Sequence, residues 1–173
     1  MKSGLANTKR ITLNGILIAL TVVTLLFATV LPTSRLSLYA LSSFYVSIVI
    51  VEYGIRNGWA FYFASGLLAL IVIPDKIGLI PYAIFFGLYG IIKFYLEKIS
   101  KIYVEYIVKL IYFNASLLIT ILLIREFFFS GIKVAFPWWT IVIALEIIFV
   151  LYDYVYTLFV RYYKNKLKRV LKI

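Results

Sequence analysis

The sequence of 173 residues contains neither cysteine nor histidine. Without cysteine the chain can form no disulfide and offers no thiolate ligand to a metal. Without histidine it offers no imidazole to zinc or haem, and no base for Cys–His or Ser–His catalysis. The sequence motifs of zinc proteases, serine hydrolases and P-loop nucleotidases are also missing. We therefore predict a protein that is not an enzyme, holds no cofactor or metal, and cannot hydrolyse ATP by itself.

Acidic residues are scarce as well, with 7 Asp and Glu against 18 Lys and Arg and a net charge of +11. Hydrophobic residues make up 64% of the chain, whereas soluble domains contain about 45–50%. A soluble domain of this size could not cover so much apolar surface, so we expect the chain to lie in a lipid bilayer. The basic residues flank apolar runs and are explained by membrane topology, so we expect no nucleic-acid partner.

Apolar runs that are candidates for membrane-spanning helices recur along the chain, since such a helix needs about 20 mostly apolar residues. They cover residues 11–31, 36–51, 59–73, 79–95, 104–124 and 137–160. We predict an all-α membrane protein, in which residues 1–173 form one transmembrane domain, a bundle of six helices with a basic tail at 161–173. The first run is too long for a signal-peptide core of roughly 7–15 residues, so we expect it to be retained. The second and third runs are short, which leaves a four-span bundle with a hairpin as the alternative.

Lysine and arginine are unevenly distributed between the alternate loops. They gather before the first run, around residues 93–101 and in the tail, and are sparser in the other loops. Because Lys- and Arg-rich segments stay in the cytoplasm, we predict that both termini are cytoplasmic. Scarce Ala with abundant Ile, Tyr and Lys hints at an AT-rich bacterial genome, so we expect a multi-pass protein of a bacterial cell membrane.

Ionisable residues inside the apolar runs are functional candidates, because they are costly in hydrocarbon. Glu146 and Asp153 lie seven residues apart and therefore share one face of the sixth helix. We expect Asp153 to form an intramembrane ion pair with Lys109, or else to belong to a binding site. Glu146 has no obvious basic partner at its depth and is the better candidate for a solute ligand. Asn114 is expected to bond another helix, with a solute contact as the alternative.

Aromatic and cationic residues at the outer ends of the runs suit a pocket for a small ring-containing solute, although each alone also fits an interfacial anchor. The substrate-binding candidates are Arg35, Tyr82, Asn114, Trp138, Trp139 and Glu146. Gly15 and Ala19 lie four residues apart in the first run, a spacing that lets two helix backbones approach closely. We expect these two residues to contact a neighbouring helix or a partner.

The layout of six runs, short loops and cytoplasmic termini resembles the substrate-binding S components of energy-coupling factor (ECF) transporters. That family carries an Ala-x-x-x-Ala motif in its first span, matched here by Gly15 to Ala19 with Gly in place of the first Ala. The resemblance implies a membrane-embedded binding subunit of a bacterial importer for a vitamin-like micronutrient. It also implies a transmembrane coupling subunit and ATPase subunits as partners, and a solute pocket near the outer face. Ligand motifs of the riboflavin, thiamine, biotin and folate members are missing, so the substrate stays open.

The layout is also similar to that of MreD, a rod-shape-determining family of the bacterial inner membrane. The turn at residues 56–58 and the Gly-Leu-Leu at 66–68 match its pattern, but the Asp that usually follows is absent from residues 69–71. This resemblance implies a structural or assembly protein of the cell envelope that binds no solute. A third interpretation is a small self-sufficient transporter, whose polar path would run through the charged groups of the fifth and sixth runs.

Overall fold

The computed structural model describes the backbone of residues 2–128 and 138–167 and the side chains of residues 8–123 and 140–166. The described residues form helices joined by short turns and contain no strand. The α-helices are α1 (Lys2–Val30), α2 (Arg35–Tyr53), α3 (Ile55–Val72), α4 (Gly87–Leu96), α5 (Ile102–Phe128) and α6 (Trp138–Tyr162). Shorter helical turns cover Pro32–Ser34, Ile77–Leu79, Tyr82–Phe86 and Tyr163–Leu167.

Six helical stretches of the described chain are long and apolar enough to cross a membrane, which confirms a multi-pass, all-α membrane protein. The fourth of them is the continuous stretch Ile77–Leu96, which ends in α4. Its π-helical turn, Tyr82–Phe86, begins directly after Pro81, whose ring and missing N–H favour a local departure from α-geometry. These six stretches favour six spans over the four-span alternative.

α2 and α3 are longer than the sequence predicted. They contain 19 and 18 residues, and 18 residues rise about 27 Å, close to the hydrocarbon thickness of roughly 30 Å. α2 continues through Glu52 and α3 includes Arg56, although both residues were expected in a loop. Polar side chains at the end of a span can reach the interface along their own length, so they do not end the helix.

Gly54 is the single residue that separates α2 from α3. Its φ is +83° and its N–H donates to the carbonyl of Ile50 over 3.0 Å. This backbone conformation favours glycine because a side chain would be strained there. Ile50 also packs against Gly58, where an added Cβ would overlap its side chain. The two helices therefore leave the turn in close contact.

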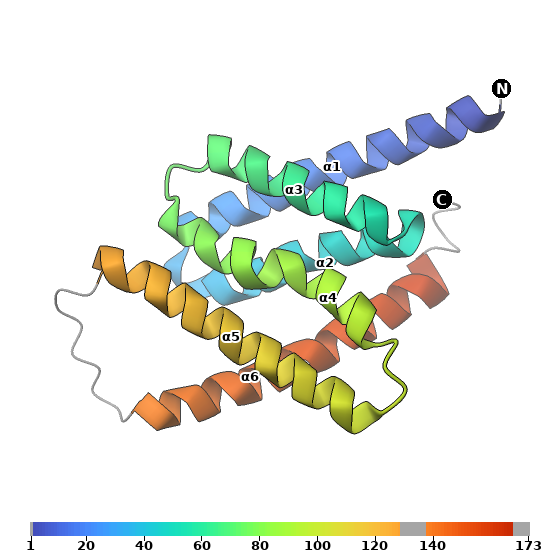
Figure 1. The fold of residues 1–173 in the computed structure, drawn as a ribbon. Coiled ribbons are helices and arrows are strands. Elements are labelled where there is room, and N and C mark those ends of the chain that lie inside the picture. The colour runs from blue at the N-terminus through green and yellow to red at the C-terminus, as the bar shows by residue number, and fades with distance from the viewer. Residues whose placement is uncertain (1, 129–137, 168–173) are drawn as a thin grey trace.

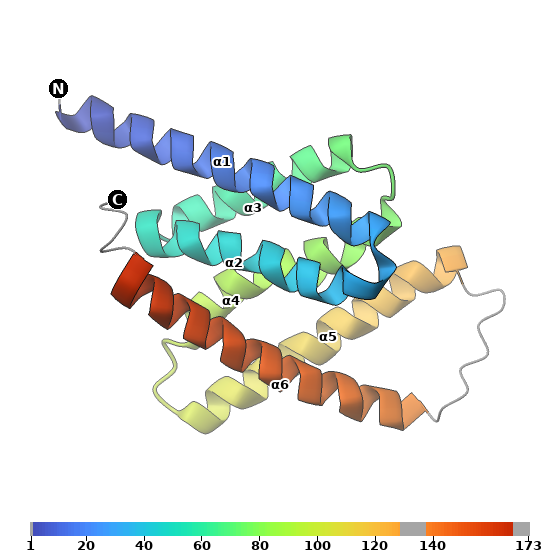
Figure 2. The same ribbon diagram turned by 180° about the vertical axis from the view of Figure 1, so that it is seen from behind.

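The helices form a packed body with two outer helices. α1, α2, α3 and Ile77–Leu96 contact one another, whereas α5 rests mainly on Tyr82–Phe86 and α4, and α6 rests on α2. In both views α5 and α6 cross near their middles and diverge on either side of the crossing (Figures 1 and 2). The start of α1 and the end of α6 lie at the same end of the bundle (Figure 1), as six crossings require.

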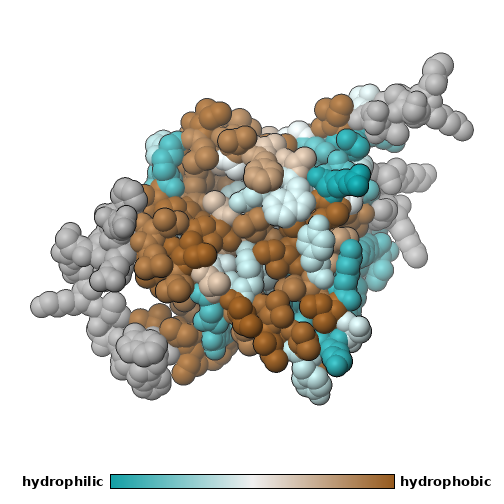
Figure 3. All heavy atoms as spheres, in the orientation of Figure 1, coloured by the Kyte–Doolittle hydropathy of each residue, from teal (hydrophilic) through white to brown (hydrophobic). Residues whose placement is uncertain are grey.

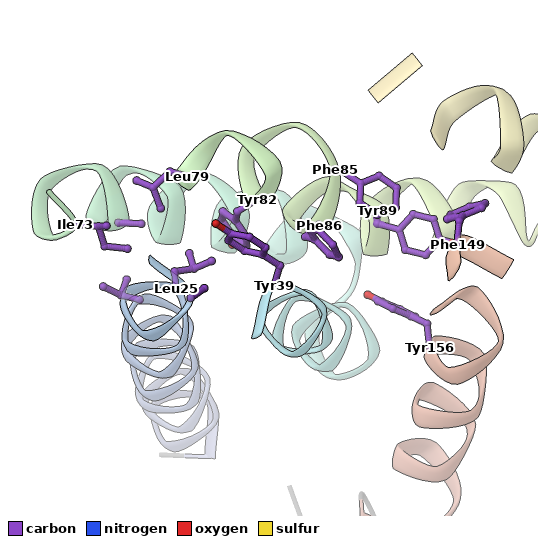
Figure 4. Close-up of a cluster of buried hydrophobic side chains, with 13 residues drawn as sticks. Leu25, Tyr39, Ile73, Leu79, Tyr82, Phe85, Phe86, Tyr89, Phe149 and Tyr156 are labelled. Atoms are coloured by element: carbon purple, nitrogen blue, oxygen red, sulfur yellow. The ribbon is translucent and has the colours of Figure 1, made fainter. Parts of the chain in front are cut away.

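The larger of the two core clusters is rich in aromatic side chains. Tyr82, Phe85, Phe86 and Tyr89 follow one another along the fourth span, and Phe149 approaches from α6 (Figure 4). Their ring centroids lie at separations typical of favourable aromatic pairs, such as 5.9 Å between Phe85 and Phe149. The smaller cluster lies among α1 to α4 and consists of Leu17, Val46, Val49, Ile50, Phe61 and Ile91.

Large apolar side chains cover much of the surface. Exposed Leu, Ile, Val and Phe occur on α1, α2, α3, α5 and α6, most densely on α3, α5 and α6. Figure 3 shows hydrophobic residues over the middle of one face and hydrophilic ones gathered toward the end where the chain begins. This surface fits a lipid surrounding, because soluble proteins rarely expose such continuous apolar areas.

Candidate functional site

A buried cluster of charged side chains joins α4, α5 and α6. At its centre is Asp153 of α6, which is 4% exposed, while Lys93 and Lys109 are each 2% exposed. Lys109 Nζ donates to Asp153 Oδ2 over 3.0 Å, and Lys93 Nζ donates to Asp153 Oδ1. Each oxygen of the carboxylate therefore has its own ammonium group, as a buried charge requires.

Four further side chains complete this ion cluster. Glu97 lies 3.2 Å from Lys93 Nζ, and Glu105 lies 2.6 Å from Lys109 Nζ, each one helical turn from its lysine. The Tyr89 hydroxyl donates to Asp153 Oδ1 over 2.5 Å, and Lys93 also donates to Thr157 over 2.8 Å. The charged groups thus satisfy one another, which suits a structural junction between helices better than a reactive centre.

The ion cluster contains the predicted pair of Lys109 and Asp153 and one lysine that was not foreseen. Lys93 lies within the predicted run 79–95, but it was counted among the cytoplasmic charges because it comes near the end of that run. The spacing of Lys93 in the sequence could have indicated its burial, since it follows Tyr89 by four residues and precedes Glu97 by four. That spacing puts all three on one helix face, the face that Tyr89 buries in the core.

Asn114 and Glu146 form a second polar contact between α5 and α6. Asn114 Nδ2 donates to Glu146 Oε1 over 3.3 Å and to the carbonyl of Leu110 over 3.0 Å. Asn114 thus bonds another helix, which was one of its two expected roles. Glu146 was expected to lack a basic partner, and its contact in the structure is this neutral amide.

The other predicted solute ligands lie elsewhere. Arg35 is exposed and its Nη2 donates to the carbonyl of Thr29 over 3.3 Å. The hydroxyls of Tyr82 and Ser65 share a hydrogen bond of 2.8 Å deep between the fourth span and α3. Trp138 and Trp139 belong to the first turn of α6, and their side chains lie outside the described part. The four described candidates, Arg35, Tyr82, Asn114 and Glu146, do not form one pocket.

A large cleft lies instead among α2, Pro81–Phe86, α5 and α6. Its volume is about 670 Å³, within the range of roughly 300–1,000 Å³ that is typical of ligand pockets. Its lining residues are Leu36, Ser37, Ala40, Leu41, Phe44, Pro81, Phe85, Phe86, Phe113, Ser116, Leu117, Thr120, Leu145, Ile148, Phe149, Leu151, Tyr152 and Val155. Arg35, Tyr82, Asn114 and Glu146 are not among them, so sequence reasoning missed this site.

The crossing of α5 and α6 explains why the space exists. Phe113 and Phe149 stack where the helices meet, with their ring centroids 4.5 Å apart and their planes 8° apart. Lys109 and Asp153 lie one turn from these rings on one side of the crossing. On the other side the helices diverge (Figure 1), and the space between them is bordered by α2 and Pro81–Phe86.

A smaller cleft, of about 240 Å³, lies between α3 and residues 76–83. Tyr82 contributes to its lining, together with Tyr62 and Lys76. Lys76 is already engaged, since its Nζ donates to the carbonyls of Leu70 and Ile73 at the end of α3. The cation therefore stabilises a helix end and is not directed at a ligand.

No protein-family model, curated protein or solved structure matches this chain. The comparisons therefore neither support nor contradict the resemblances to ECF S components and to MreD. The larger cleft and the ion cluster are the structural features that bear on function.

Proposed function

We propose that this protein is the membrane-embedded binding subunit of a bacterial importer for a small micronutrient-like solute. ATPase subunits would energise the import through a transmembrane coupling subunit. The observation that carries the proposal is the cleft of about 670 Å³ within the spanning helices. Its aromatic lining and few hydroxyl groups match the usual composition of a small-molecule site.

The cleft favours a binding subunit over a scaffold. Helical bundles are normally packed so densely that few voids remain, because unfilled space forfeits dispersion contacts. A protein that only joins other proteins has no need of such a space beside its core. Phe85, Phe113 and Phe149 are held by contacts with one another, so they form a preorganised wall on which a ring-containing solute can stack.

The exposed face of α1 supports docking of a coupling subunit. Gly15 and Ala19 are exposed on it, and a Cβ added at Gly15 would meet nothing within 4 Å. The neighbouring Ile16 and Leu20 are also exposed. A small-residue stripe flanked by large apolar side chains allows close helix–helix contact in lipid, which supports docking of a partner helix here.

In the proposed orientation, the end of the bundle where α1 begins and α6 ends lies in the cytoplasm. The basic residues of the described chain gather at that end, in the first turns of the span at 8–30, around 93–101 and near the end of α6. The opposite end has fewer, among them Arg35 and Lys76. This distribution follows the positive-inside rule.

The exposed α1 face also fits the second candidate function, an MreD-like assembly subunit that docks on cell-envelope proteins and binds no solute. Purification of the tagged protein from its own bacterium, with identification of the proteins that accompany it, separates the two candidates. We expect a pair of ATPases and a membrane coupling protein. Recovery of cell-wall synthesis proteins in their place would contradict the importer.

Two tryptophan substitutions sharpen this experiment. Ala19→Trp should abolish partner recovery, because it places a bulky ring on the exposed α1 stripe. Ala40→Trp should fill the cleft and leave the partners in place. Ile141→Trp, on an exposed position of α6, is the matched control and should change neither property. Loss of partners with Ile141→Trp but not with Ala19→Trp would refute the assignment of the docking face.

A further inference from the structure

The larger cleft has no charged group in its described lining. The residues that form it are apolar or carry hydroxyls, and the hydroxyls are those of Ser37, Ser116, Thr120 and Tyr152. A charged solute would therefore lose its hydration without gaining a counter-ion, which is strongly unfavourable.

The nearby charges are not available to compensate. Asp153, Lys93 and Lys109 are buried and paired with one another, and none of them lines the cleft. Glu146 contacts Asn114 and does not line the cleft. The electrostatics of the site thus select an uncharged molecule.

Two of the four hydroxyls can only accept a hydrogen bond from a solute. Ser116 donates its hydroxyl proton to the carbonyl of Tyr112 over 2.8 Å, and Tyr152 donates its own to Ser43 over 2.7 Å. Because a hydroxyl has one proton and two acceptor positions, each of these oxygens still offers a lone pair. A solute that carries an O–H or N–H donor would satisfy them.

The rim of the cleft lies in the apolar part of the bundle. Leu41 of α2 and Ile148, Leu151 and Val155 of α6 line the cleft and are also exposed. α2 and α6 contact each other, and they diverge toward the end of the bundle at which both helices begin (Figure 2). All four rim residues lie well inside the spanning stretches, so acyl chains, and not water, surround this opening.

We infer that the solute of the proposed binding subunit is an uncharged, largely apolar ring compound with at least one hydroxyl or N–H donor, and that it enters sideways from the bilayer between α2 and α6. This inference rests on the proposed function and specifies its substrate class. A lipid acyl chain would match the apolar wall but would leave the acceptor oxygens of Ser116 and Tyr152 unused.

Three probes of equal ring size test the inference with the purified protein in lipid nanodiscs. They are 2-naphthol, which is neutral with a donor, naphthalene, which is neutral without one, and 2-naphthoate, which is an anion. We expect 2-naphthol to bind about tenfold more tightly than naphthalene, as one retained hydrogen bond implies, and 2-naphthoate to bind least. Ala40→Trp should abolish binding of all three.

Serine substitutions locate the hydrogen bond. Ser116→Ala should reduce the preference for 2-naphthol over naphthalene. Ser42→Ala is the matched control, because Ser42 bonds the carbonyl of Tyr39 in the same way but does not line the cleft. An equal effect of both substitutions would overturn the assignment of the acceptor to Ser116.

The outcomes separate this inference from the proposed function. Binding of 2-naphthoate as tight as that of 2-naphthol, or a charged molecule that co-purifies and is lost in Ala40→Trp, would overturn the substrate class and leave the binding subunit intact. Selective 2-naphthol binding without any ATPase partner would support the substrate class and contradict the importer. Organic extraction that yields only phospholipid, together with no probe binding, would overturn this inference in favour of a lipid site.

Discussion

At the scale of single residues, the structure depends on how a few polar groups are paired in hydrocarbon. Asp153 receives hydrogen bonds from two lysines and a tyrosine, and no other described carboxylate contacts both lysines. Removing one member of a buried ion pair leaves an uncompensated charge, whereas replacing the whole set with apolar residues is far less costly. The cluster is therefore sensitive to partial substitution.

Asp153→Asn tests this pairing. It keeps the shape of the side chain but removes the charge that Lys93 and Lys109 share, so we expect a loss of about 3–5 kcal/mol in unfolding free energy. SDS titration of the protein in mixed micelles, followed by circular dichroism, measures the change. Ser42→Ala, at a buried position away from the cluster, should lower the stability by less than about 1.5 kcal/mol. A stability of Asp153→Asn equal to that of the wild type would show that the cluster does not hold the helices.

Part of this arrangement of charged residues could be predicted from the sequence. Lys109 and Asp153 could be paired because each is an isolated charge within an apolar run at a similar depth. Lys93 was not recognised as a member of the cluster because a lysine near the end of an apolar run is usually read as an interfacial, cytoplasmic charge. Whether such a lysine turns inward depends on the facing helix, and Asp153 is 60 residues away along the chain. That proximity is a property of tertiary packing.

At the scale of elements, close approaches between helices set the positions of the cleft walls. Gly90 of α4 faces Tyr156 of α6, whose hydroxyl donates to the carbonyl of Ser43 over 3.1 Å. An added methyl group at Gly90 would overlap that hydroxyl oxygen. This contact joins α4, α6 and α2 next to Tyr152 and Val155, which line the cleft, and a side chain at Gly90 would displace Tyr156.

Gly90→Ala should therefore destabilise the protein by about 1–3 kcal/mol, the usual range for overpacking a core. Adding Tyr156→Phe, which removes the overlapped oxygen, should restore part of the loss. Gly66→Ala is the control, because nothing lies within 4 Å of its added Cβ, and it should be neutral or slightly stabilising. The same titration measures all three variants. If Gly66→Ala proved as harmful as Gly90→Ala, helix propensity and not steric overlap would explain the effect.

The helices themselves were largely predictable, but their mutual placement was not. The apolar runs predicted the positions of the spans. Their ends were misplaced where a helix continues through polar residues such as Glu52 and Arg56. The cleft depends on the crossing of α5 and α6 and on side chains such as Ala40, Phe85 and Phe149 from distant parts of the sequence. Hydropathy carries no information on that crossing, so the predicted pocket was built on exposed or otherwise bonded residues instead.

At the scale of the whole molecule, the spans bring the start of α1 and the end of α6 to the same end of the bundle (Figures 1 and 2). In the proposed orientation, which follows the distribution of Lys and Arg, that end lies in the cytoplasm. The turn after α4 should then face the cytoplasm, and the turn after α3 should face outward.

The absence of native cysteine allows a clean test of the orientation. Single variants Asp75→Cys and Ser100→Cys place one thiol in the turn after α3 and one in the turn after α4. A membrane-impermeant maleimide added to intact cells should label the first and not the second, and lysis should make both reactive. Labelling of Ser100→Cys alone in intact cells would reverse the orientation.

The cleft remains the feature on which the proposed function depends, and its occupancy can be measured with one pair of proteins. Native mass spectrometry of the wild type and of Ala40→Trp, both purified in mild detergent from the native cells, compares the small molecules that each retains. We predict that the wild type carries an uncharged organic molecule and that Ala40→Trp carries none. A wild type that is bare in repeated preparations, or the same molecule on both proteins, would contradict a solute site in the cleft.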